Sequence, residues 1–222
     1  MNLPKRVQNL EQILIQLLER KIFPEESYLA GGTAVYYYLH HRVSIDLDFF
    51  TPKPFNAEAL VFKMRQAFQE VDLELIEKES LIMFLTSEKL KFSFFYLPYK
   101  FLSGLSYYEV RPGIPCPLAS LQDIEAMKAL ALAQRGSAKD FIDLYYLLRK
   151  TGHSFDDLAR LVQRKYQVDE KYNYHLKTAM VYFDDAEREV ESIFLAGKQV
   201  EIRRMTEKEW EEIKKFFVRF CR

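Results

Sequence analysis

The sequence predicts an α+β fold in which a small mixed sheet with flanking helices is followed by a C-terminal helical bundle. Three observations support this prediction. Residues 42–50 alternate polar and apolar side chains, which is the period of a half-buried strand. Three strand-like runs follow within residues 72–97, and the short polar turns between them favour antiparallel neighbours. Beyond residue 117 the apolar residues recur at helical spacing.

The composition is that of a folded globular protein. The chain has 222 residues, 49% of them hydrophobic and 29% charged, with no low-complexity tract. Lys plus Arg and Asp plus Glu are both 32, so overall charge cannot provide a sequence-independent grip on nucleic acid. The two cysteines, Cys116 and Cys221, predict neither a zinc site nor a disulfide framework.

The start of the chain predicts a cytoplasmic protein. Gln and Glu interrupt its apolar residues, and no small-residue cleavage site follows, so we do not expect a signal peptide. No apolar stretch reaches the roughly 20 residues that a membrane span needs, so we expect no membrane association.

The first half is expected to interleave helices and strands. An amphipathic helix covers about the first twenty residues, and a short apolar strand at residues 27–30 runs into the Gly31-Gly32 turn. Further helices are expected over 33–41 and 56–70, and further strands over 72–77, 81–86 and 90–97. Residues 98–117 contain two glycines and four prolines, which predicts a domain seam or a long active-site loop.

The second half is expected to be helical throughout. The predicted helices cover residues 119–135, 138–150, 154–166, 170–189 and 206–220. This change of character divides the chain into a mixed core, residues 1–112, and a helical C-terminal domain, residues 113–222.

Two carboxylates stand together on the alternating strand. Alternation directs Ser44, Asp46 and Asp48 to one face and the apolar residues between them to the other. Adjacent negative charges repel each other unless a cation joins them, and a hard divalent cation such as Mg²⁺ prefers carboxylate and phosphate oxygens. Asp46 and Asp48 therefore predict a metal site, although such a pair can also form a solvated face.

A glycine turn shortly before these carboxylates favours an anion. The strand ending at Ala30 turns through Gly31 and Gly32 into a helix, which exposes backbone N–H groups at a positive helix terminus. Thr33 can donate its hydroxyl to a phosphate or cap the helix. Either feature alone is common, but their order along the chain brings a phosphate cradle and a metal site together.

These residues resemble a known family. Gly31-Gly32-Thr33 with residues 41–50 is similar to the signature of the AbiEii/AbiGii toxin family, a branch of the nucleotidyltransferase superfamily. Residues 128–135 and 139–148 are similar to that family's second block. The resemblance implies a nucleotidyltransferase-like sheet, Mg²⁺ and a nucleoside triphosphate at the first motif, and nucleotidyl transfer. Several members are toxins of toxin–antitoxin or phage-defence systems, which implies an antitoxin partner and an RNA or protein acceptor.

The resemblance also implies roles for three residues of the second block. It makes Lys128 a contact of the triphosphate and adds Asp140 and Asp143 to the catalytic set. On position alone, Lys128 is a surface lysine and the two aspartates, three apart and so neighbours on the helix surface, are helix-capping charges.

The residues just before the carboxylates have several possible partners. Arg42 and Ser44 are expected among the nucleotide-binding residues, and Arg42 alternatively pairs with a carboxylate of the strand or forms a surface salt bridge. His40 and His41 have no partner at metal-ligand spacing, so we expect them on the surface. The run Tyr36-Tyr37-Tyr38 could stack on a base, but at least part of it is expected in the core.

One departure from the superfamily pattern bears on catalysis. A third carboxylate is usual on a later central strand, but here Ser93 occupies the expected position. A serine is no base near neutral pH, so activity would need Asp140, Asp143 or the substrate's own phosphate to accept the proton. The alternative is a catalytically degenerate module that binds nucleotide or protein without transfer.

Overall fold

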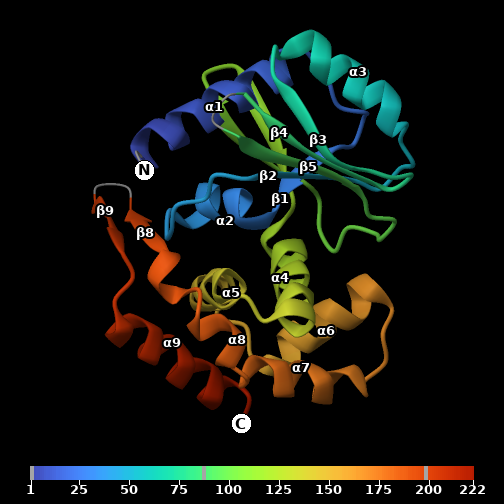
Figure 1. Ribbon diagram of the computed structural model, residues 1–222. Helices are drawn as coiled ribbons and strands as arrows, with labels where there is room; N and C mark the ends of the chain where they lie inside the picture. Colours follow the sequence, from blue (N-terminus) through green and yellow to red (C-terminus); the bar gives the residue numbers. More distant parts are fainter. Residues whose placement is uncertain (1–2, 87–88, 198–199) are drawn as a thin grey trace. The chain divides into compact units, whose positions relative to one another are not determined.

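The strand-like runs of the first half fold into one mixed sheet in the computed structural model, which describes residues 3–86, 89–197 and 200–222 (Figure 1). The strands are β1 (Tyr28–Ala30), β2 (Leu47–Thr51), β3 (Val71–Ile76), β4 (Ser80–Leu85), β5 (Leu90–Tyr96), β6 (Ser106–Arg111) and β7 (Ile114–Leu118), in the order β3-β4-β5-β2-β1-β7-β6. The pairs β2–β5 and β1–β7 are parallel, and the other pairs are antiparallel. The predicted α+β class is confirmed.

The residues of the chain pack as two compact units. The first comprises residues 1–34, 44–100 and 105–119, and contains the sheet. The second comprises residues 35–43, 101–104 and 120–222. The boundary between residues 112 and 113 stays a prediction, because packing within a folded chain does not test which segments fold independently.

Strand β2 has the predicted alternation over a shorter range. Leu47 and Phe49 are buried, whereas Asp48 between them is partly exposed. The strand begins at Leu47 and not at residue 42, because the segment before it is bonded elsewhere: the main-chain oxygen of Asp46 accepts a hydrogen bond from the Thr33 hydroxyl. The first carboxylate therefore precedes the strand, and the second lies on it.

Two helices lie on the same side of the sheet (Figure 1). Helix α1 (Leu3–Glu19) buries a stripe at helical spacing, and Phe23 after it stacks on Phe49 with ring centroids 4.2 Å apart. Helix α3 (Ala57–Ala67) begins after Asn56, whose side chain accepts from the Ala59 amide at 2.9 Å. The buried stripe of α1 is Leu10, Ile13, Leu14 and Leu17.

The long loop predicted over residues 98–117 was wrong for residues 106–117, whereas segment 101–104 of the second unit lies inside the range predicted for a seam. Strands β6 and β7 form a hairpin over the later residues, and it is part of the sheet. Pro115 and Pro117 are two residues apart, so both lack an N–H on the same side of β7. That side faces β1, since the Ala119 amide, two residues further on, donates to the Leu29 carbonyl oxygen. The prolines therefore leave the pairing with β6 intact.

The second unit is mainly helical. It contains α4 (Leu121–Arg135), α5 (Ala138–Thr151), α6 (Phe155–Tyr166), α7 (Tyr172–Met180), α8 (Asp184–Glu187), η1 (Val190–Ser192) and α9 (Glu207–Phe220). Left-handed Gly136 and Gly152 end α4 and α5. Helix α2 (Gly31–Leu39) begins in the first unit and ends in the second. Among the described residues, no helix is both long and apolar enough to cross a membrane.

Two predictions for the second half were wrong. The expected helix over residues 170–189 is interrupted after Met180. The centroid of the Phe183 ring lies 5.1 Å from that of Phe141 and 6.1 Å from that of Trp210. Tertiary packing of this aromatic group overrides local helix propensity. The second half also contains a hairpin that periodicity did not predict, β8 (Phe194–Gly197) with β9 (Val200–Arg204).

Candidate functional site

The glycine corner, residues Gly31 to Thr33, lies directly against one carboxylate. Gly31 has a φ of +65°, which favours glycine. A Cβ atom at residue 31 would lie 2.5 Å from Asp48 Oδ2 and 3.1 Å from Asp48 Cβ. The Asp48 carboxylate therefore occupies the space that any larger residue at position 31 would need.

Thr33 ties the start of helix α2 to the segment that carries the other carboxylate. Its side chain is 1% exposed, and its Oγ1 lies 2.5 Å from the main-chain oxygen of Asp46 and 2.9 Å from Ser44 Oγ. A carbonyl oxygen only accepts, so the Thr33 hydroxyl donates to the main-chain oxygen of Asp46. The Thr33 oxygen then accepts a second hydrogen bond from the Ser44 hydroxyl. The hydroxyl groups of Thr33 and Ser44, which were predicted at the nucleotide site, are therefore engaged in internal hydrogen bonds. The backbone N–H groups of the glycine corner remain the groups predicted to bind phosphate.

The carboxylates fit a cation that is shared with a substrate. Asp46 and Asp48 are both partly exposed, and each offers hard oxygen donors. No group of three or more His, Cys, Asp or Glu side chains in the described part of the chain is arranged to hold a metal ion. Mg²⁺ is typically held by one or two carboxylates together with substrate phosphates and water, so a two-carboxylate donor set suits it.

Ser93 is the lateral neighbour of Asp48 in the sheet. The parallel register of β2 and β5 pairs Asp48 with Ser93, which directs both side chains to the same face. Ser93 is 1% exposed, and its partner on the next strand is Ile82. This row of the sheet therefore contains one carboxylate, then a hydroxyl, then an aliphatic side chain.

Four of the predicted residues, Arg42, Lys128, Asp140 and Asp143, form a charge cluster in the second unit together with two residues that were not predicted, His41 and Arg135. The aspartates were expected on the helix surface or as capping charges, but both are fully buried. The expectation failed because α5 is packed on most of its circumference: Ile142 and Leu147 are buried as well as the predicted Phe141.

Asp143 is the centre of the charge cluster. Arg42 donates to it twice, from Nε to Oδ1 at 2.6 Å and from Nη2 to Oδ2 at 2.7 Å. His41 Nε2 lies 2.6 Å from Oδ1, and Lys128 Nζ lies 2.7 Å from Oδ2. Arg42 thus has a buried carboxylate as a partner, and the interpretation of Arg42 as a surface salt bridge was wrong.

Lys128 is a buried member of the cluster and not a surface lysine. Its side chain is 7% exposed, and its Nζ donates to Asp140 Oδ1 at 3.0 Å in addition to Asp143. Arg135, whose side chain is largely exposed, completes the pairing of Asp140 with bonds of 2.6 and 2.9 Å. The two aspartates together fix the position of the Lys128 ammonium group.

The pairing keeps these groups ionised. Burial alone would raise the pKa of Asp143, but Arg42 and Lys128 outweigh it and hold the pKa well below its usual range. Burial alone would lower the pKa of Lys128, but Asp143 and Asp140 outweigh it and raise the pKa. Asp143 is therefore a weak proton acceptor, and Lys128 stays a cation.

Three cationic side chains contact the two carboxylates of the cluster. They are Arg42, Lys128 and Arg135, and burial lowers the pKa of His41, which favours its neutral form. The expectation that His41 lies on the surface was wrong, since it is 5% exposed, whereas the burial of Tyr37 confirms that part of the tyrosine run is core.

Solved structures place this fold in a known class. The structure of JHP933 from Helicobacter pylori aligns with a TM-score of 0.52 at 19% identity, covering 83% of this chain and 95% of that one. MenT4, a nucleotidyltransferase toxin from Mycobacterium tuberculosis H37Rv, aligns with a TM-score of 0.53 at 14% identity, covering 100% of this chain and 85% of that one. The protein thus has the fold of the nucleotidyltransferase toxins.

Sequence comparison identifies the family within that class. The family described as "Nucleotidyl transferase AbiEii toxin, Type IV TA system" matches residues 12–220. An uncharacterized protein of Aquifex aeolicus (strain VF5) is 38% identical over 196 residues, which cover 86% of this chain and 84% of that protein. This chain belongs to the AbiEii nucleotidyltransferase toxin family, and the resemblance that its motifs indicated is confirmed.

Replacing Gly31 with alanine tests the contact with Asp48. We expect Gly31→Ala to lose more stability than the roughly 1–2 kcal/mol that a left-handed backbone costs an L-residue, because its Cβ also displaces the Asp48 carboxylate. Gly113→Ala is the matched control, since Gly113 has a φ of +81° and nothing within 4 Å of its Cβ position. Urea unfolding measures both variants, and equal losses would contradict the contact.

Neutralising Asp143 should destabilise the second unit. In Asp143→Asn, Arg42 and Lys128 lose the buried anion between them, and we expect a loss of about 3–5 kcal/mol at pH 7. Because folding lowers the pKa of Asp143, the wild-type advantage is complete above the unfolded pKa of about 3.9 and is lost as pH falls through the lower folded value. Urea unfolding between pH 7 and pH 2 measures this convergence.

The control for this prediction is Asp185→Asn, because Asp185 is exposed on α8. Its free energy of unfolding should stay within about 0.5 kcal/mol of wild type. A loss for Asp143→Asn that did not shrink below pH 4 would show that the charge of Asp143 is not its source.

Proposed function

We propose that the protein transfers a nucleoside monophosphate from a Mg²⁺-bound nucleoside triphosphate to a hydroxyl group of an RNA or protein acceptor. The observation that carries the proposal is the contact of Asp48 with the glycine corner. It puts a metal-binding carboxylate beside a turn whose backbone N–H groups can bind phosphate. Membership of a nucleotidyltransferase family supports this assignment.

The proposed reaction is a single displacement at phosphorus. The acceptor oxygen forms a bond to the α-phosphorus, the bond from that phosphorus to the bridging oxygen breaks, and pyrophosphate leaves with the bonding electrons. When bound, Mg²⁺ offsets charge on the phosphate oxygens. Asp46 and Asp48 would hold it, and the corner at Gly31 and Gly32 would orient the phosphates through backbone N–H groups.

The charge cluster would supply positive charge to the reaction. Lys128 is kept protonated and in place by Asp140 and Asp143, so we propose it as a point charge for the triphosphate and the aspartates as its positioning residues. Arg42, which donates to Asp143, helps to hold that aspartate in position. We propose that Ser44 supports Thr33 in the nucleotide site through the hydrogen bond between their hydroxyl groups.

The acceptor proton needs a base other than a third carboxylate. Ser93 stands where that carboxylate is usual. Asp143 is a weak base because Arg42 and Lys128 lower its pKa, and Asp140 is a weak base because Lys128 and Arg135 lower its pKa. Of the alternatives that the sequence left open, these facts favour the substrate: the proton would pass from the acceptor hydroxyl to a phosphate oxygen. Positioning would then account for most of the rate enhancement.

We further propose that the protein is a toxin that acts in the cytoplasm and is held in check by an antitoxin. The support is the family's description as the toxin of a Type IV toxin–antitoxin system. MenT4, whose fold is similar, is itself described as a nucleotidyltransferase toxin.

A second candidate is a nucleotide-binding or protein-interaction module without transfer activity. The side chains next to Asp48 in the sheet favour this candidate. They are Ser93 and then Ile82, and neither residue supplies a carboxylate. Measurable nucleotide binding without label transfer to any acceptor would support this candidate.

Neutralising the two carboxylates should abolish transfer. With labelled nucleoside triphosphates, Mg²⁺ and either total RNA or total protein, we expect Asp46→Asn and Asp48→Asn each to lower label incorporation at least about a hundredfold. Glu74→Gln, a change at an exposed residue of β3, is the control and should keep wild-type incorporation. The arm that takes up label identifies the acceptor, and full incorporation by Asp48→Asn would refute the proposed site.

Replacing Ser93 tests whether its hydroxyl takes part in proton transfer. Since a general base typically contributes at least about a hundredfold, Ser93→Ala should lower the rate by much less than that if the substrate accepts the proton. Initial rates of label incorporation, compared with those of Asp48→Asn, measure the difference. A hundredfold loss in a Ser93→Ala variant with an unchanged melting temperature would contradict this expectation and show that the hydroxyl takes part in catalysis.

A further inference from the structure

The second unit contains a partly exposed imidazole that a buried carboxylate orients. His153 lies between α5 and α6, directly after the left-handed Gly152 that ends α5. Its Nδ1 lies 2.7 Å from Oε2 of Glu125, whose side chain on α4 is fully buried. The proposed reaction uses neither residue, so the function of this pair is still to be assigned.

The Glu125 carboxylate is held in place by two donors. Thr151 donates its hydroxyl to Oε1 at 2.6 Å, and the His153 ring meets Oε2. Burial raises the pKa of Glu125, whereas the bonds from Thr151 and His153 oppose that rise; Asp157 acts in the same direction as burial. The two donors favour the ionised carboxylate, which only accepts, so Nδ1 of His153 carries the proton.

The second ring nitrogen of His153 is open to solvent. The side chain is 28% exposed. Its Nε2 bonds to none of the described residues, and it is not one of the buried polar atoms that lack a partner in that part of the chain. Because the proton is on Nδ1, the accessible Nε2 has a lone pair that is available to a reactant.

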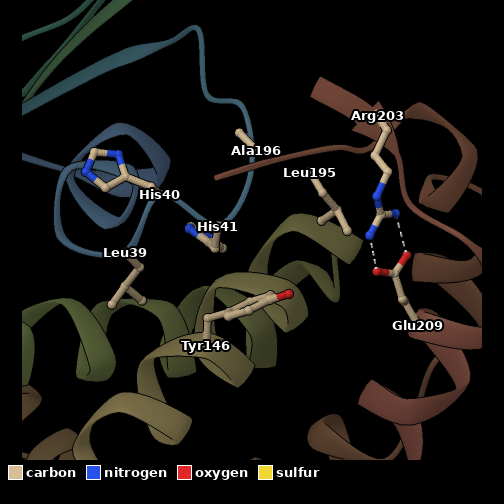
Figure 2. Close-up of a pocket in the computed structure, with 8 residues that line it drawn as sticks. All are labelled: Leu39, His40, His41, Tyr146, Leu195, Ala196, Arg203 and Glu209. Carbon is tan, nitrogen blue, oxygen red and sulfur yellow. Dashed lines mark hydrogen bonds and ion pairs between the residues drawn. The ribbon is translucent and has the colours of Figure 1, made fainter. Parts of the chain in front are cut away.

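His41 also has a carboxylate partner, but it is closed to reactants. It follows α2 next to His40, as Figure 2 shows. Its side chain is 1% exposed, and its Nε2 lies 2.6 Å from Asp143. Its other nitrogen, Nδ1, is buried. His153 therefore differs from His41 in combining a carboxylate partner with an accessible nitrogen.

A pair of this kind makes histidine a nucleophile. The carboxylate fixes the tautomer and the orientation of the ring, and it offsets the positive charge that the ring acquires when Nε2 forms a bond. Glu125 is placed to do both. A metal ion on Nε2 would need further ligands, and the described residues contain no group of three or more side chains that could hold one.

The proposed reaction centre suits an acceptor that has no proton to lose. The row beside Asp48 continues with Ser93 and Ile82, so no carboxylate there takes a proton from an acceptor hydroxyl. An imidazole nitrogen with an available lone pair needs no base before it attacks phosphorus. The absence of a carboxylate from this row and the accessible nitrogen of His153 point to the same reaction.

We propose that the protein also transfers a nucleoside monophosphate to Nε2 of His153 in a second copy of its own chain. The Nε2 lone pair forms a bond to the α-phosphorus, the bond from that phosphorus to the bridging oxygen breaks, and pyrophosphate leaves with the bonding electrons. The proton stays on Nδ1, and Glu125 offsets the charge of the ring. The proposal rests on the proposed nucleotidyl transfer and extends it to a nitrogen acceptor.

The place of His153 on α5 favours transfer between two chains. Residues 143 and 151 are both on this helix, about 12 Å apart along its axis at roughly 1.5 Å per residue. Asp143 holds Lys128, the proposed contact of the triphosphate. The bond to Glu125 keeps the His153 ring from turning towards that lysine. A second copy is therefore the simpler source of the nucleotide.

Self-labelling of the full chain tests the proposal. Purified protein is incubated with Mg²⁺ and nucleoside triphosphates labelled at the α-phosphate, and the label on the denatured chain is measured. We expect His153→Gln to lower it at least about tenfold. His175→Gln is the matched control, because His175 is exposed on α7, and it should keep wild-type labelling. Equal labelling of wild type and His153→Gln would overturn the proposal.

An added acceptor separates this proposal from the proposed function. Wild-type protein is incubated with the same labelled nucleotides and with total RNA or total protein. Label on the added acceptor without label on the chain would overturn self-transfer alone, whereas no label anywhere would refute both. His153→Gln should still label the added acceptor, since His153 is not part of the proposed nucleotide site.

Mixing two variants identifies the chain that supplies the nucleotide. Asp48→Asn lacks a metal-binding carboxylate and His153→Gln lacks the acceptor, so neither should label itself. When the two are mixed, with one carrying a size tag, transfer between chains predicts label on the Asp48→Asn chain. An unlabelled mixture beside a labelled wild type would overturn the assignment to a second copy.

A measurement on wild-type protein does not depend on a variant that folds. With ¹⁵N-labelled histidine under mildly alkaline conditions, the nitrogen resonances of His153 should show the proton on Nδ1, because Glu125 accepts from it. A proton on Nε2 would remove the lone pair on which the transfer depends, and the proposal would fail.

Discussion

The contact between Gly31 and Asp48 is the constraint on which the rest of the proposed site depends. Hydrogen is the only substituent that fits at residue 31 without moving the carboxylate, and the left-handed backbone there also favours glycine. The same turn starts helix α2, and Thr33 in its first turn bonds to the main chain at Asp46. One corner of the chain thus determines where both acidic residues lie.

The buried charge cluster shows how a lysine is kept cationic without water. Removing Lys128 from solvent is unfavourable by itself, and the two aspartates offset this cost because each is within 3.0 Å of the ammonium nitrogen. Asp143 in turn accepts four bonds, from Arg42, His41 and Lys128. Such an arrangement suits electrostatic stabilisation, which needs charges held in advance, better than proton transfer, which needs a base of accessible pKa.

The sequence predicted those features that depend on local pattern. Alternation located Leu47, Asp48 and Phe49, and the glycines located the turn. It did not predict the burial of His41 or Asp143, since that depends on which segments pack around them and not on their own spacing. The β6–β7 hairpin was missed for a related reason: proline normally interrupts a strand, and only its partners reveal that Pro115 and Pro117 face the side with little pairing.

The division of one short segment between the two units limits how this family can vary. His41 and Arg42 bond within the second unit, whereas Ser44 and Asp46 bond within the first, and Val43 alone separates the two sets. Surface loops generally tolerate added residues at small entropic cost. Here a single insertion or deletion would shift one set of bonds relative to the other, so evolution can exchange side chains in this segment far more easily than it can change its length.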